Sequence, residues 1–208
     1  MIYTIYKDNL DEIKYNPIGK TIKNVSSNSY LLGETAMWRF ILDDAKQTNE
    51  KTVGIFQARR MLCGPSEIQP DKIYHTSYYI NGNNASLWQV SHPTAANLLI
   101  NACNVIVALH PEYIDTVNMV LRGNILFPHN MWVMPIERFE EYINFYESVI
   151  TNMKLPPDPP KIGSLLSERI FTIWSLHNIP LKDHVFLSAL AFDKNTGEVI
   201  NNVDGVAD

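Results

Sequence analysis

The chain has 208 residues, of which 46% are hydrophobic and 19% are charged, as in an ordinary globular domain. Its net charge of −5 argues against a strongly basic nucleic-acid-binding protein, although it is compatible with a local basic groove. The two cysteines are too few for a secreted disulfide framework, and no apolar run approaches the roughly 20 residues that span a bilayer. Since the N-terminus also lacks a signal-peptide pattern, we predict a cytoplasmic protein without a membrane span.

The first half of the chain alternates strand patterns with helix patterns. The sequence MIYTIY, at 1–6, predicts a first strand, and the helical spacing of apolar residues predicts a helix at 26–47. A short buried strand is expected at 53–56. Residues 64–92 are rich in Gly, Pro, Asn, Ser and Tyr, and we interpret them as an extended, loop-rich insertion with strand pieces around HTSYYI, at 75–80.

The second half continues this alternation, interrupted by the sequence LPPDPP at 155–160, which predicts a stiff connector. Strands that alternate with helices predict a single α/β domain over 1–192, with a mostly parallel central sheet flanked by helices. A turn and a loosely held tail are expected at 193–208. The other expected elements are a helix at 92–103, a buried strand at 104–109, a helix at 111–123, a strand at 130–135, helices at 136–154 and 164–178, and a strand at 184–193.

Two arginines follow the predicted strand at 53–56. In parallel sheets ligands bind beyond the carboxyl ends of the strands, and Arg59 and Arg60 lie just past such an end. Because a guanidinium group can bind phosphate through two hydrogen bonds, the pair indicates a site for an anionic ligand. The alternative is structural: adjacent residues of an extended segment point to opposite faces, so one arginine is then free to pair with Glu34 or a surface carboxylate.

Five segments, in this order, resemble a family of bacterial and phage domains of unknown function. Its members occur in capsular and other polysaccharide gene clusters and are described as glycosyltransferase-like. The resemblance covers roughly residues 1–177 and implies a single-domain GT-A-like sandwich, a nucleotide-sugar donor such as a UDP-sugar, and a sugar acceptor. The segments are YNPIGKTI, NSYLLGETAMWRF, VGIFQARRM, HNMWVMPIERFEEY and SLLSERIFTIW.

The family pattern, together with the residue types beside it, selects eight candidate site residues. They are Glu168 and Glu34 as catalytic carboxylates, Arg59, Arg60 and Arg169 as ligands of the donor phosphates, and Asn130, Trp38 and His129 as substrate ligands. A carboxylate such as Glu168, among apolar neighbours, needs a partner or its pKa rises toward that of a general base.

Each candidate also has a structural interpretation. Glu34 suits the first turn of a helix, and Glu168 with Arg169 suits an ion pair that fastens a helix. Asn130 suits a turn, in which its own side chain bonds the backbone, and His129 suits an exposed loop.

The sequence departs from the family pattern at several points, among them Asn104, where the family commonly has an acidic residue. Where the family has a tetrad like His-Tyr-Arg-Arg, this chain has Gln57, Ala58, Arg59 and Arg60. It also has no Asp-x-Asp motif, which many sugar transferases of this fold use to hold a divalent metal. The resemblance therefore assigns no metal ligand, and it leaves dependence on manganese or magnesium open.

The leading hypothesis is a glycosyltransferase that moves a sugar from a nucleotide-sugar donor to an acceptor hydroxyl. The acceptor is a glycan or, if the chain is phage-encoded and acts in the host cytoplasm, a hydroxymethylated or glycosylated DNA base extruded from the stack. The alternative is a catalytically inactive binding or host-interaction protein on the same scaffold. The oligomeric state is not predicted.

Overall fold

The structure is a computed structural model that describes residues 1–6, 20–23, 35, 37–57, 60–63, 67–154, 163–193, 196 and 198–203. The predictions for Glu34, Arg59 and the connector at 155–160 concern residues outside this set, as does most of the first part of the helix predicted at 26–47.

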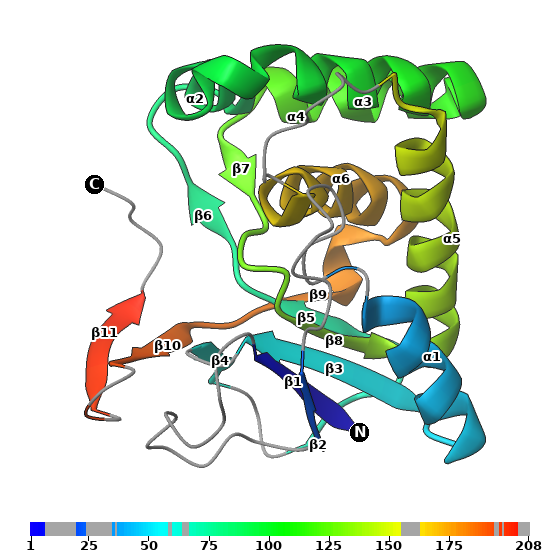
Figure 1. Cartoon of the computed structure of the whole chain (residues 1–208), viewed down its shortest axis with the longest axis vertical. Helices are drawn as coiled ribbons and strands as arrows, with labels where there is room; N and C mark the ends of the chain where they lie inside the picture. The colour runs from blue at the N-terminus through cyan, green and yellow to red at the C-terminus, as the bar shows by residue number, and fades with distance from the viewer. Residues whose placement is uncertain are drawn as a thin grey trace.

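A nine-stranded sheet forms one layer of the described chain (Figure 1). Its central strand, β3, pairs with β1 on one side and with β8 on the other, and the β4–β10–β11 ribbon extends from its end. The strands are β1 (Ile2–Tyr6), β2 (Lys20–Lys23), β3 (Thr52–Gln57), β4 (Arg60–Leu62), β5 (Ile73–His75), β8 (Trp132–Pro135), β9 (His184–Phe186), β10 (Ala189–Phe192) and β11 (Val199–Val203).

The sheet is mixed, so the prediction of a mostly parallel sheet is wrong. Strands β1, β2 and β3 are parallel neighbours, as are β5 and β9, but β8 runs antiparallel to both β3 and β5. The register places Ile55, Trp132 and His75 in one row across these strands. As a result, the start of β8 lies at the same edge of the sheet as the carboxyl ends of β3 and β5. We call this the carboxyl edge.

Helices cover one face of the sheet in successive layers (Figure 1). Helix α6 (Gly163–Asn178) lies above the strands, and α2 (Asn84–Ser91), α3 (Ala96–Leu109) and α4 (Ile114–Arg122) form a layer beyond it. Helix α5 (Ile136–Asn152) stands at one side and contacts α1 (Trp38–Gln47), α3 and α6. Short 3-10 turns lie at Pro93–Ala95, Pro111–Tyr113 and Leu181–Asp183, and a separate two-stranded ribbon joins β6 (Tyr78–Tyr79) to β7 (Ile125–Leu126).

Most of the predicted elements are confirmed, but the strand predicted at 104–109 is wrong. These residues continue α3, which ends at His110 just before Pro111. No glycine or proline separates them from the helix before them, and Leu99, Ala102 and Ile106 recur at helical spacing on its buried face. Helix propensity is a weak prior, so burial of this face outweighs the strand preference of the β-branched residues.

Two other segments differ in detail from the prediction. In the insertion at 64–92, the strand pieces expected around 75–80 correspond to the end of β5 and to β6, whereas α2 was not predicted. The N-cap of α2 is Asn83, whose side chain accepts a hydrogen bond from the Ser86 N–H. The single strand predicted at 184–193 is two strands, β9 and β10, while β11 lies within the expected turn and tail and pairs with β10.

The core is dominated by aromatic side chains between the sheet and α1, α5 and α6. Trp38 of α1 lies with its ring centroid 5.3 Å from that of Tyr142 and 6.1 Å from that of Trp132. The helix predicted at 136–154 is confirmed as α5, and its residues Phe139, Tyr142 and Ile143 are buried in this core. Among the described residues, no helix combines the length and the apolar character needed to cross a bilayer.

Candidate functional site

A turn at residues 127–130 leads into β8 at the carboxyl edge and has an unusual backbone. His129 and Asn130 both have positive φ, 74° and 48°, although neither is a glycine. Side chains with a Cβ disfavour this left-handed region by roughly 1–2 kcal/mol per residue, although asparagine tolerates it better than most. Such strain persists only where surrounding contacts enforce it, and it is frequent at functional sites.

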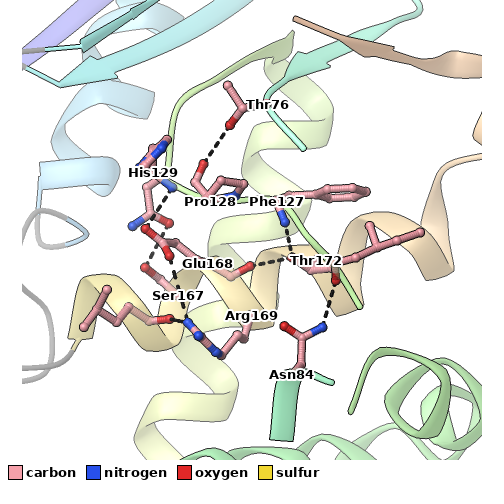
Figure 2. Close-up of polar contacts among 12 residues, drawn as sticks. Thr76, Asn84, Phe127, Pro128, His129, Ser167, Glu168, Arg169 and Thr172 are labelled. Carbon is pink, nitrogen blue, oxygen red and sulfur yellow. Dashed lines mark hydrogen bonds and ion pairs between the residues drawn. The ribbon is translucent and has the colours of Figure 1, made fainter. Parts of the chain in front are cut away.

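Three hydrogen bonds, from the end of β5 and from α6, hold this turn (Figure 2). From beside β5, the Thr76 hydroxyl donates to the Pro128 carbonyl at 3.1 Å. From α6, the Thr172 hydroxyl accepts the Phe127 N–H at 3.0 Å. The Ser167 hydroxyl donates to the side-chain oxygen of Asn130, also at 3.0 Å. The turn therefore links the sheet to α6 at the carboxyl edge.

A chain of hydrogen bonds crosses the turn and joins three of the predicted site residues. The Arg60 guanidinium donates to Gln57 Oε1 at 2.9 Å, and Gln57 Nε2 donates to the His129 carbonyl at 2.6 Å. The His129 N–H then donates to Glu168 Oε1 at 2.8 Å. We call these four residues, Arg60, Gln57, His129 and Glu168, the edge network.

The edge network continues into a buried guanidinium. Arg169 Nη1 lies 4.0 Å from Glu168 Oε2 and donates to the Leu165 carbonyl at 2.9 Å, while its Nε has no hydrogen-bond partner within the described part of the chain. The guanidinium stacks over the ring of Trp88 at 4.7 Å. Burial lowers the pKa of Arg169, and the Glu168 carboxylate opposes this effect. Arg60, Glu168 and Arg169 together place two guanidinium groups and one carboxylate in this region.

The His129 side chain is neutral near neutral pH. Burial, with a smaller contribution from the positive charge of Arg60, lowers its pKa to about 4. A neutral imidazole can accept a proton or a hydrogen bond, which an imidazolium cannot. His129 thus brings an uncharged ring close to Arg60, and it does not compete with Arg60 for an anion.

A buried pair of histidines packs against Phe127 of the turn. His75 Nε2 and His184 Nδ1 are 2.9 Å apart, across the parallel strands β5 and β9, and the His75 ring lies 4.1 Å from that of Phe127. Burial lowers the pKa of His75 to about 3. These histidines have no metal-ligand spacing in the sequence, so their pairing was not predicted. Among the residues that the structure describes, no three His, Cys, Asp or Glu side chains gather as a metal-binding group.

The remaining predicted site residues fall outside the edge network. Trp38 is 1% exposed and lies in the aromatic core, and its assignment as a substrate ligand stays a prediction. Asn130 is also 1% exposed, and its side-chain oxygen accepts from the Ser167 hydroxyl of α6, so its assignment as a substrate ligand stays a prediction too. Glu34 and Arg59 lie outside the described residues.

The sequence analysis missed the residue that connects the site. Gln57 was noted only as a departure from the family tetrad, yet it bonds both Arg60 and His129. Its position in the sequence could have indicated this role, because it is the last residue of a buried strand, where a polar side chain faces the carboxyl edge. No sequence pattern indicated the roles of Ser167, Thr76 and Thr172, because buried hydroxyl groups are common in helices and at strand ends.

A family model described as "Domain of unknown function (DUF4422)" matches residues 21–179, well over half of the chain. The chain belongs to this family. No curated protein matches the sequence significantly. This DUF4422 domain is similar to a solved apo structure of the WbbM bifunctional glycosyltransferase, with a TM-score of 0.73 and 14% sequence identity.

The similarity covers 90% of this chain but only 44% of the WbbM chain, so the DUF4422 domain corresponds to less than half of that protein. At this identity the likeness concerns the fold. It supports the predicted glycosyltransferase-like α/β architecture. The occurrence in capsular loci or phages stays a prediction.

Proposed function

We propose that this DUF4422 domain is a glycosyltransferase that moves a sugar from a nucleotide-sugar donor to an acceptor hydroxyl. The observation that carries the proposal is the edge network, which joins a guanidinium to a carboxylate where ligands of α/β sheets bind. The similarity in fold to a glycosyltransferase supports it.

Arg60 is suited to the diphosphate of the donor. Its guanidinium is half-buried and donates to a neutral amide. When the bond between the sugar and the diphosphate breaks, the leaving group takes the electron pair and gains negative charge. A positioned guanidinium stabilises that charge more in the transition state than in the ground state. We extend this role to Arg59, the preceding residue, and to Arg169 beside Glu168.

Glu168 is suited to the acceptor. Its Oε1 is fixed by the His129 N–H, so the carboxylate has a defined position. In the proposed step the carboxylate takes the proton of the acceptor hydroxyl, and the hydroxyl oxygen attacks the anomeric carbon as the diphosphate departs. Glu34 remains a second candidate for this base.

The substrates follow from the same chemistry. We propose a UDP-sugar as the donor and, as the acceptor, either a glycan or a DNA base that already carries a hydroxymethyl group or a sugar. Trials with and without manganese or magnesium belong in the same experiment, because the residues present assign no metal ligand.

The test is a transfer assay. The full chain is incubated with a panel of nucleotide-sugars and with glycan and modified-DNA acceptors, and mass spectrometry detects a hexose or pentose increment. We expect an increment that forms much more slowly in both Arg60→Ala and Glu168→Gln. Arg138→Ala, which removes one member of an exposed ion pair with Glu141 on α5, is the matched control and should leave it unchanged. Transfer by both site variants at the parental rate contradicts the proposed roles. No transfer from any donor favours the inactive binding protein.

A further inference from the structure

We infer that Gln57 is a positioning residue, which holds Arg60 at the carboxyl edge without neutralising its charge and couples it to the turn that carries Glu168. The inference rests on the proposed function in one respect: it takes the ligand of Arg60 to be a diphosphate. It adds a residue that the sequence pattern did not select, and it explains why that position carries an uncharged side chain in this chain.

The two hydrogen bonds of Gln57 require an amide-like group. Arg60 can only donate, so the Gln57 atom that faces it must accept. The His129 carbonyl can only accept, so the atom that faces it must donate. A glutamine side chain offers both functions on two separate atoms and carries no charge. A glutamate at this position is able to accept from Arg60 but, when ionised, places a carboxylate oxygen against the His129 carbonyl.

Arg60 has an uncharged hydrogen-bond partner, whereas three other arginines of the described chain lie beside a carboxylate. Arg39 pairs with Glu147, Arg138 pairs with Glu141, and Arg169 lies beside Glu168. Arg60 donates to an amide instead, and the described residues place no carboxylate within ion-pair distance of it. Its position is therefore fixed while its full positive charge remains for a ligand. An incoming diphosphate then has neither a carboxylate to displace nor a flexible side chain to order.

The same amide couples the two ends of the edge network. Gln57 Nε2 bonds the carbonyl of His129, and the N–H of that residue bonds Glu168. His129 is held at a φ of 74°, in a turn that contacts from β5 and α6 also fix. A movement of Arg60 thus strains the turn that positions Glu168. Loss of the Gln57 amide is expected to loosen both the anion-binding group and the carboxylate.

The experiment compares substitutions of Gln57 in the full chain, with inorganic pyrophosphate and uridine diphosphate as calorimetric probes. We expect Gln57→Glu to weaken the affinity for both probes about tenfold, since it pairs Arg60 with a carboxylate. Gln57→Met has a similar length but no hydrogen bonds, and should weaken the affinity by about threefold. The salt dependence of binding should become shallower in Gln57→Glu alone, because one effective positive charge is lost there.

A matched control separates this local effect from the change in net charge. Arg39 Nη2 donates to Asn144 Oδ1 at 2.9 Å on the exposed surface of α5, so Asn144→Asp repeats the amide-to-carboxylate change beside another guanidinium. We expect it to leave the affinity for pyrophosphate within about twofold of the parent. Thermal unfolding verifies that each variant is folded, and Gln57→Met serves as the test if Gln57→Glu does not fold.

The outcomes distinguish this inference from the proposed function. Equal affinities of the parent and Gln57→Glu for pyrophosphate overturn the inference, as does a parent that binds neither probe. If the predicted pattern of affinities is found but no donor supports transfer, the proposed function fails and the inference stands. If transfer is found and Gln57→Glu transfers like the parent, the inference fails and the proposed function stands.

Discussion

The turn at His129 and the aromatic core around Trp132 lie three residues apart in the chain, but they are built in different ways. At the turn, the backbone is strained and hydrogen bonds from β3, β5 and α6 fix it. In the core, Trp132 packs against Trp38, Phe139 and Phe171, and the indole N–H groups of Trp38 and Trp132 have no hydrogen-bond partner among the residues that the structure describes.

This difference separates two kinds of stabilisation in adjacent residues of the chain. An unpaired buried N–H group costs about 1–3 kcal/mol, so its presence in the core indicates that the burial of large rings outweighs this loss. At the carboxyl edge, by contrast, the strain is matched by directed polar contacts. Substitutions in the core should therefore change the free energy of unfolding, whereas substitutions in the edge network should change ligand binding and transfer.

The largest expected effect on stability is that of Trp38→Ala. Its ring is buried against Trp132, Tyr142 and Tyr146, so we expect the free energy of unfolding to fall by about 3–5 kcal/mol. Urea denaturation measures this loss. Phe40→Ala, on the same helix but with its ring 53% exposed, should change it by less than about 0.5 kcal/mol. An unchanged unfolding midpoint together with weakened nucleotide binding would instead support the assignment of Trp38 as a substrate ligand.

The next effect is that of Glu168→Gln on the proposed transfer. An amide oxygen can still accept the His129 N–H, so the turn should keep its place, but the proton acceptor is lost. We expect kcat to fall by roughly 100-fold. Glu141→Gln, on the exposed face of α5, provides the control and should leave kcat unchanged. A Glu168→Gln variant with the parental kcat would reduce Glu168 to a structural partner of Arg169.

The pH dependence of stability tests the buried histidine pair. The pKa of His75, about 3 in the folded chain, lies below the value of about 6.5 expected after unfolding, so the unfolded state binds the proton more readily. The contribution of neutral His75 to the free energy of unfolding is fully present above pH 6.5 and is lost as the pH falls toward 3. Between pH 7 and pH 5 the loss amounts to about 2 kcal/mol.

The variant His75→Gln isolates this contribution. It should be less stable than the parent at pH 7, but the free energy of unfolding should fall less steeply on acidification. His129, whose pKa is also lowered, lies outside the histidine pair, so it contributes equally to the slope of both proteins and cancels in the difference. Parallel pH profiles of the parent and His75→Gln contradict the burial of a neutral His75.

The smallest effect concerns the strained backbone. Because His129 has a φ of 74°, His129→Gly should be more stable than His129→Ala by about 1 kcal/mol, although glycine removes more side-chain contacts. The same pair of substitutions at Asp115, an exposed residue in the first turn of α4, should favour alanine. If alanine is also favoured at position 129, the turn is not strained in solution.

Much of the fold could be predicted from the sequence, because burial leaves a periodic pattern. The strand at β3 and the helices α5 and α6 were predicted, since each has apolar residues at the spacing of its own geometry. The strand predicted at 104–109 failed because a short apolar run fits a helix equally well. The antiparallel course of β8 was missed because pairing direction depends on contacts between distant segments.

The site was predictable only in part, for a similar reason. Arg60, His129 and Glu168 were selected by their residue type and position, and the structure joins them. Gln57 was not selected, since its importance lies in two partners that are 3 and 72 residues away in the chain. Trp38 was assigned to the ligand because sequence alone does not distinguish an aromatic residue that binds a sugar from one that packs in the core.

The central claim is that Arg60 presents its positive charge to a nucleoside diphosphate at the carboxyl edge. Calorimetric titration of uridine diphosphate into the parent, Arg60→Ala and Arg138→Ala tests it most directly. We expect measurable binding to the parent and to Arg138→Ala, and an affinity at least about tenfold weaker for Arg60→Ala. Equal affinities for the parent and Arg60→Ala would contradict the claim, as would a parent that binds no nucleoside diphosphate.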